Sequence, residues 1–209
     1  MQQFAAAALL AIVALFATSA GQASAGHRQS MLRSDGTWTF AGLSPAARAN
    51  VAADAAAAIP AAQPVLDLLD GSIAIDTDAL LCGPTGGCSR AEDSQGRNWT
   101  MHLPSDWVSG TYQAQRFLVL HEIGHAAWHL VLHGADRSAF IAAVERSLAG
   151  RPCRQFRHEG PCAPIGEMFA DEFARWAGGF EVAMSSYETP SLLTSAQFGA
   201  VMQDAMARS

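Results

Sequence analysis

The sequence contains no lysine, only two tyrosines and few charged residues of either sign. All 13 basic residues are arginine, and the net charge of −6 is spread along the chain rather than gathered in one tail. Without a basic patch, neither nucleic acid nor an anionic membrane is favoured as a partner. Charged residues make up 15% of the chain and hydrophobic residues 50%, so a packed globule is favoured over disorder.

Long apolar runs are also scarce. The run from Phe4 to Ala17 is shorter than the ~20 residues that a membrane-spanning helix needs. Small residues follow it and end in Ala23-Ser24-Ala25, a pattern that signal peptidase accepts. We therefore expect residues 1–25 to be a signal peptide and residues 26–209 to form one domain, secreted or periplasmic, with no stable membrane association after cleavage. Met1-Gln2-Gln3 lacks a basic residue, which departs from the usual secretory signal, and an uncleaved membrane anchor is the alternative. The oligomeric state is not indicated.

The four cysteines fall into two local pairs. Cys82 and Cys88 bracket a loop rich in glycine and proline, and Cys153 and Cys162 bracket a loop that carries arginines. Two local disulfides are the simplest of the three possible connectivities, and neither pair has the two-residue spacing of a zinc knuckle. Disulfides also agree with export to an oxidising compartment.

Capping and periodicity signals predict an α+β domain, with a small mixed sheet early in the chain and helices later. Ser44-Pro45 marks the start of the first helix, Pro60 and Pro64 its end, and Gly134 a helix C-cap. Residues 26–42 are expected to form an irregular lead-in. The expected helices cover residues 44–58, 112–132, 136–148, 165–177 and 194–207, and the expected strands cover residues 72–76 and 98–103.

The segment His121-Glu122-Ile123-Gly124-His125 lies within the longest of these helices. Two imidazoles four residues apart project from one helix face, so both reach a single tetrahedral metal ion. Glu122 is placed to act on a water molecule at the open coordination position. Gly124 costs a helix ~1 kcal/mol relative to alanine, which indicates that another element approaches closely at this point.

A catalytic zinc site needs a third protein ligand. One family of zinc peptidases supplies a histidine ten residues after the first, but Val131 occupies that position here. His129 and His133 are rotated about 80° and about 120° from His121 around the helix, so neither converges easily on the metal. Both are interpreted as supporting or surface residues.

The better candidate for the third ligand is Glu167, which stands four residues before Asp171 on one face of a later helix. Asp171 is expected to accept the spare N–H of a ligating histidine and so to fix its tautomer. Glu172 points elsewhere. The alternative is that Glu167 and Asp171 form an ordinary acidic face of a surface helix.

The two motifs, residues 121–125 and the segment Glu167-Met168-Phe169-Ala170-Asp171-Glu172-Phe173, resemble the zincin metallopeptidases whose third ligand is a glutamate, and especially their anthrax lethal-factor-like branch. The resemblance covers roughly residues 95 to 178. It implies a zincin-like fold and one Zn²⁺ per chain. By resemblance, the metal ligands are His121, His125 and Glu167, and Glu122 is the catalytic residue that activates water.

The resemblance also implies a peptide or protein substrate held as an extended strand along an edge strand, which residues 98–103 match best. One feature departs from the lethal-factor branch, which has a tyrosine shortly before its third ligand. No tyrosine lies between His125 and Glu167 here, so the residue that stabilises the oxyanion is unassigned. The alternatives are Arg154, Arg157, His158 and Tyr187.

Three other interpretations stay open. A peptide deformylase also has a histidine-glutamate-x-x-histidine helix, but it takes an upstream cysteine as third ligand, and the nearest upstream cysteine here is Cys88. A non-catalytic zinc-binding interaction module derived from a peptidase would not need Glu122. A toxin or host-directed effector would differ in substrate rather than in chemistry.

Overall fold

The computed structural model describes residues 39–40, 44–69, 73–76, 82, 88–91, 99–103, 112–148, 164–181 and 192–208. The predicted signal peptide, residues 1–25, lies outside these ranges. So do the pair Cys153 and Cys162 and all four alternatives for the oxyanion donor, and these predictions stay untested.

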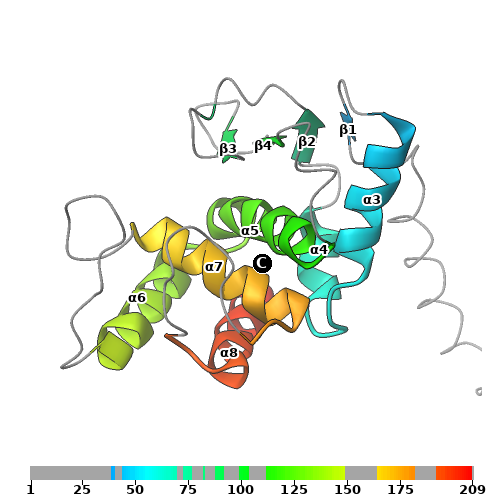
Figure 1. Ribbon diagram of the computed structural model, residues 1–209. Coiled ribbons are helices and arrows are strands. Elements are labelled where there is room, and N and C mark those ends of the chain that lie inside the picture. Colours follow the sequence, from blue (N-terminus) through cyan, green and yellow to red (C-terminus); the bar gives the residue numbers. More distant parts are fainter. Residues whose placement is uncertain are drawn as a thin grey trace, which may run out of the picture.

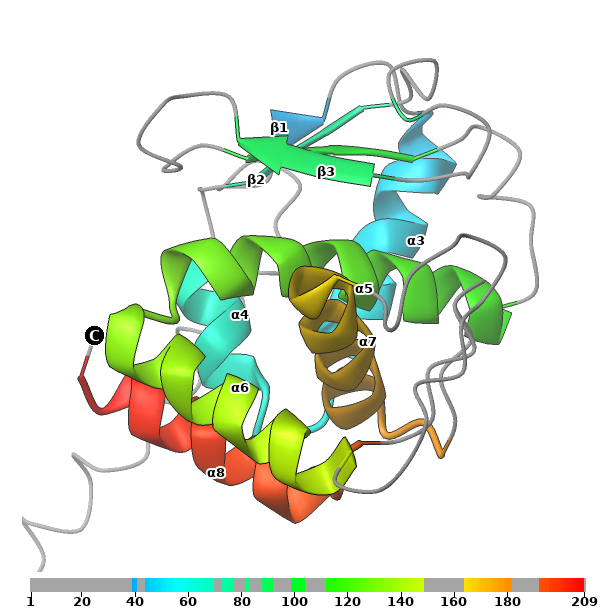
Figure 2. The same ribbon diagram turned by 90° about the vertical axis from the view of Figure 1, so that its left-hand side faces the viewer.

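The described part is α+β, as predicted. The strands are β1 (Thr39–Phe40), β2 (Ile73–Asp76), β3 (Cys88–Ala91) and β4 (Trp99–His102). The helices are α3 (Pro45–Ala56), α4 (Gln63–Leu69), α5 (Tyr112–Leu130), α6 (Gly134–Leu148), α7 (Ile165–Gly178) and α8 (Ser195–Met206). The small sheet lies on one side of α5, and α6, α7 and α8 lie on the other (Figures 1 and 2).

The sheet is mixed, with the strand order β1-β2-β4-β3. β2 is parallel to β1 and β4, whereas β3 is antiparallel to β4. The expectation that residues 98–103 form an edge strand is therefore wrong, because β4 lies between β2 and β3. The edge strands are β1 and β3, and β3 packs against α5 (Figure 2). Its sequence, Cys-Ser-Arg-Ala, has no alternation of apolar and polar residues, so no strand was expected there.

Helix α5 is central to the core. It contacts the sheet on one side and packs along α7 on the other, so apolar residues surround it instead of forming a single stripe. The buried hydrophobic side chains that it supplies are Phe117, Val119, Leu120, Ile123, Ala126, Ala127 and Trp128. A helix enclosed on two sides positions its polar residues firmly, because few other rotamers fit.

Three helix ends have defined caps, and the cap at Ser44 was predicted from the sequence. Ser44 accepts a hydrogen bond from the backbone N–H of Ala47 at the start of α3. Thr194 and Gln197 form a reciprocal capping box at the start of α8. Helix α7 ends at Gly179, whose φ of 67° is in the left-handed region that glycine adopts without strain.

Three local predictions were wrong. Gly134 does not cap α5 but is the first residue of α6, and Asp136 within the first turn accepts the N–H of His133 at 3.1 Å. Pro64 does not only end a helix but lies in the first turn of α4, where proline is tolerated. The expected irregular lead-in, residues 26–42, contains strand β1.

Candidate metal centre

His121 and His125 lie one turn apart on α5, and their rings meet edge to face with centroids 4.9 Å apart. His121 is buried and His125 is partly buried. This is the arrangement that the four-residue spacing predicted.

Glu167 reaches the same point from α7, where it lies in the first turn. The two helices approach closely at Gly124, since a Cβ atom built there would be 2.8 Å from Ala170 Cα. The prediction that another element approaches Gly124 is thus confirmed. The close crossing brings a carboxylate of one helix to the imidazoles of the other.

The three side chains fit a tetrahedral metal ion. The Nε2 of His121 is 3.3 Å from one carboxylate oxygen of Glu167, and the Nε2 of His125 is 3.5 Å from the other. The three ligand atoms lie within 4.8 Å of one another. A tetrahedral zinc ion with bonds of about 2.0–2.1 Å places its ligand atoms about 3.3 Å apart. The cluster therefore has the spacing of a metal site, which the acidic-face alternative does not require.

Asp171 supports the cluster from one turn further along α7. Its Oδ1 is 2.8 Å from the Nδ1 of His121, and both groups are buried. A hydrogen bond from Nδ1–H leaves the lone pair of Nε2 free for a metal. Asp171 therefore lies where a histidine-orienting carboxylate was predicted.

The ionisation of the cluster follows from these contacts. Burial lowers the pKa of His121, but hydrogen bonds with Asp171 and Glu167 outweigh it and raise the pKa to about 10. Burial alone would raise the pKa of Glu167. The hydrogen bonds with His121 and His125 have the larger combined effect and bring this pKa well below its ordinary value. The site thus gathers negative charge around imidazoles, which favours a bound cation.

Glu122 lies between the two histidines in sequence and is buried. Its Oε2 accepts no hydrogen bond from the described part of the chain. Burial raises the pKa of this carboxyl group, and the charges on His121 and His125 oppose that rise without cancelling it. A buried carboxylate oxygen without a hydrogen-bond partner costs free energy of folding. A ligand or a water molecule bound to this oxygen would remove that cost.

Ser89 on strand β3 was not among the predicted site residues. Its hydroxyl donates a hydrogen bond to the main-chain carbonyl of Glu122 at 3.3 Å and so joins the edge strand to α5. Nothing in the sequence pointed to it, because no strand was expected at this position.

The other candidates lie outside the cluster. His129 and His133 are exposed, and the ring of His129 packs against Trp99 with centroids 4.7 Å apart. Glu172 on α7 points away from the cluster, as predicted. It pairs with Arg175 and accepts the N–H of Leu192.

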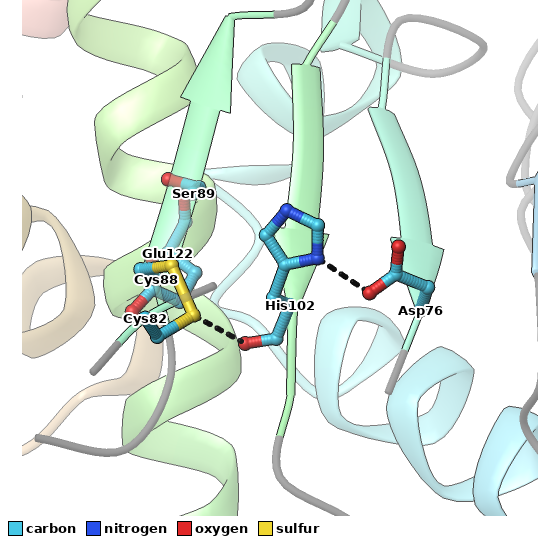
Figure 3. The surroundings of a disulfide bond; sticks show 6 residues. All are labelled: Asp76, Cys82, Cys88, Ser89, His102 and Glu122. Atoms are coloured by element: carbon cyan, nitrogen blue, oxygen red, sulfur yellow. Dashed lines mark hydrogen bonds and ion pairs between the residues drawn. A yellow bond between two sulfur atoms is a disulfide. The ribbon is translucent and has the colours of Figure 1, made fainter. Parts of the chain in front are cut away.

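Cys82 and Cys88 form a disulfide, as predicted (Figure 3). Cys88 is therefore not a thiolate ligand, which removes the ligand set of a deformylase. The Sγ of Cys82 lies 3.9 Å from the main-chain carbonyl oxygen of His102, a van der Waals contact because a disulfide sulfur carries no hydrogen.

A second histidine–aspartate pair, in which His102 is buried and Asp76 is partly exposed, is separate from the metal cluster. The Nδ1 of His102 is 2.5 Å from Oδ1 of Asp76 on the neighbouring strand (Figure 3). His102 follows Met101 on β4, so its side chain lies on the opposite face of the sheet, away from the core face that packs on α5.

Comparisons with protein-family models, with curated proteins and with solved structures found no match to this chain. Among the described residues, no helix combines the length and the apolar character that crossing a bilayer demands.

Proposed function

We propose that the chain is an exported, zinc-dependent metallopeptidase with a zincin-like fold, which hydrolyses peptide bonds in a peptide or protein substrate. The observation that carries the proposal is the convergence of His121, His125 and Glu167, with the buried carboxyl group of Glu122 on the same helix as the histidines. Two imidazoles and one carboxylate are a donor set of catalytic zinc, with the fourth position left for water. One Zn²⁺ is expected per chain.

The chemistry follows from the chain's own groups. Zinc, when bound, acidifies a water molecule and polarises the carbonyl group to be attacked. Glu122 accepts the proton of that water through its unpartnered carboxylate oxygen and then gives it to the departing amine. Glu122 holds the proton between these two steps. Asp171 keeps the ring of His121 oriented throughout.

The edge strand β3 is the proposed substrate strand, in place of residues 98–103. β3 ends the sheet and packs against α5, the helix that carries the histidines and Glu122. An extended peptide adds to such an edge through main-chain hydrogen bonds, and side chains on alternate faces then determine selectivity.

Two features support export: the apolar N-terminal segment and the disulfide between Cys82 and Cys88.

The test compares wild-type protein with Glu122→Gln, each loaded with zinc and incubated with a library of peptides. We expect the wild type to cleave peptides and to lose this activity on treatment with a chelator. The Glu122→Gln variant should bind zinc as the wild type does but cleave at least about 100-fold more slowly, since a general base contributes about 10²–10⁴-fold. Glu145→Gln, on the exposed face of α6, is the matched control.

Two results would contradict the proposal. Undiminished cleavage by Glu122→Gln would remove the assigned base. A wild-type protein that binds zinc tightly yet cleaves no peptide would favour the non-catalytic interaction module instead.

A further inference from the structure

Strand β3 is fixed by three neighbouring connections, and the third of them joins it to α5. Its first residue, Cys88, is bonded to Cys82. Its backbone pairs with β4, where Cys88 is opposite His102. Its second residue, Ser89, donates a hydrogen bond to the main-chain carbonyl of Glu122. Figure 3 shows Ser89 and the disulfide next to each other on the strand.

The direction of the Ser89 side chain follows from the register. Ser89 is opposite Met101, which is fully buried on the face of the sheet that packs on α5. Its hydroxyl therefore points from the strand toward the helix. Cys88 and Arg90 point to the other face, since side chains alternate along a strand.

The carbonyl that Ser89 contacts has a second donor. Within an α-helix, the carbonyl of Glu122 is the acceptor for the N–H four residues later, and a carbonyl oxygen has a further lone pair. Ser89 fills that position at 3.3 Å. The strand is thereby tied to the residue that acts as base.

We propose that Ser89 is a positioning residue of the hydrolytic reaction, whose hydroxyl sets the separation between the substrate strand β3 and Glu122. This inference rests on the proposed function. A substrate paired with β3 takes its place from that strand, whereas the base and two metal ligands belong to α5. Small errors in the separation of reacting groups cost rate more than binding, because the attack requires the reacting atoms to be about 3–3.5 Å apart.

The first test is steady-state kinetics of Ser89→Ala and Ser89→Thr with the best substrate of the wild type. Loss of one hydrogen bond, about 1 kcal/mol, corresponds to a fall in kcat of about fivefold, with KM nearly unchanged. Ser89→Thr keeps the hydroxyl and should restore most of kcat. The matched control is Ser138→Ala, which removes another serine hydroxyl that donates to a main-chain carbonyl, that of Gly134, on α6.

The second test measures binding instead of turnover, with two hydroxamates added to the zinc-loaded protein. Acetohydroxamate contacts only the metal and its surroundings, whereas a tripeptide hydroxamate also extends along β3. The tripeptide compound must reach the metal while it is paired with β3, as the transition state does, so we expect Ser89→Ala to weaken it about fivefold and to leave acetohydroxamate unchanged. A purely structural role would alter both affinities equally or neither.

The outcomes separate this inference from the proposed function. If the wild type cleaves peptides and Ser89→Ala matches it in kcat and in both affinities, only the role of Ser89 is overturned. If the wild type cleaves nothing but the tripeptide affinity depends on Ser89, the peptidase fails and the positioning role remains. Binding of neither hydroxamate by the wild type overturns both.

Discussion

The contact between α5 and α7 at Gly124 determines whether the three metal ligands meet. In Gly124→Ala, the new Cβ would be 2.8 Å from Ala170 Cα, whereas ordinary contacts of this kind are 3.4–4 Å. Because Ala170 Cα is a backbone atom, α7 itself must move away by at least about 0.6 Å, which is several times the ~0.2 Å tolerance of a metal–ligand distance. Glu167 moves with α7, while the two histidines stay on α5.

Two effects of the Gly124→Ala substitution are expected. Overpacking costs about 1–3 kcal/mol, and alanine returns ~1 kcal/mol of helix propensity, so the free energy of unfolding should fall by about 1 kcal/mol. Zinc affinity should fall about tenfold or more, as when a ligand loses its orientation. Urea unfolding of the metal-free protein and competition with a chromophoric chelator measure the two quantities.

Gly134→Ala is the matched control, because a Cβ there meets nothing within 4 Å. It should keep zinc affinity and leave stability unchanged or up to about 1 kcal/mol higher. If Gly124→Ala were more stable than the wild type and bound zinc equally well, the close crossing of α5 and α7 would be refuted.

Three further changes have defined outcomes. Asp171→Asn should weaken zinc binding about 10–100-fold in a chelator competition, because His121 loses a charged hydrogen-bond acceptor. Replacing Cys82 and Cys88 by serine should lower the free energy of unfolding by about 2 kcal/mol, the loop entropy of so short a ring, in urea titrations. Burial raises the pKa of Asp54 from 3.8 to about 6, so the folded protein binds this proton more tightly than the unfolded chain does. The free energy of unfolding therefore falls as pH rises through 6 and Asp54 loses its proton. At pH 7, Asp54→Asn should be up to about 3 kcal/mol more stable than the wild type, and most of this difference should be lost by pH 4.

The features predictable from the sequence are those that depend on neighbours in the chain. The caps at Ser44 and Thr194 and the spacing of His121 and His125 are fixed within one or two helical turns. The close approach at Gly124 was also predictable, because a glycine inside a helix is costly unless something fills its place.

The features that the sequence did not reveal depend on distant parts of the chain. The position of β4 inside the sheet depends on β3, whose residues carry no strand pattern and take their place from pairing with β4. Helix α4 was missed because Pro64 was interpreted only as a helix end, although proline is compatible with the first turn. The role of Ser89 follows from tertiary contact alone.

The most direct test of the account is the zinc content of the purified protein, determined by elemental analysis beside His125→Ala, Glu167→Ala and the control Glu145→Ala. We expect one zinc per chain in the wild type and in Glu145→Ala, and loss or strong weakening of zinc binding in both ligand variants. Zinc that remains bound with unchanged affinity in Glu167→Ala, or a wild type that binds none, would contradict the central claim that α5 and α7 together form a metal site.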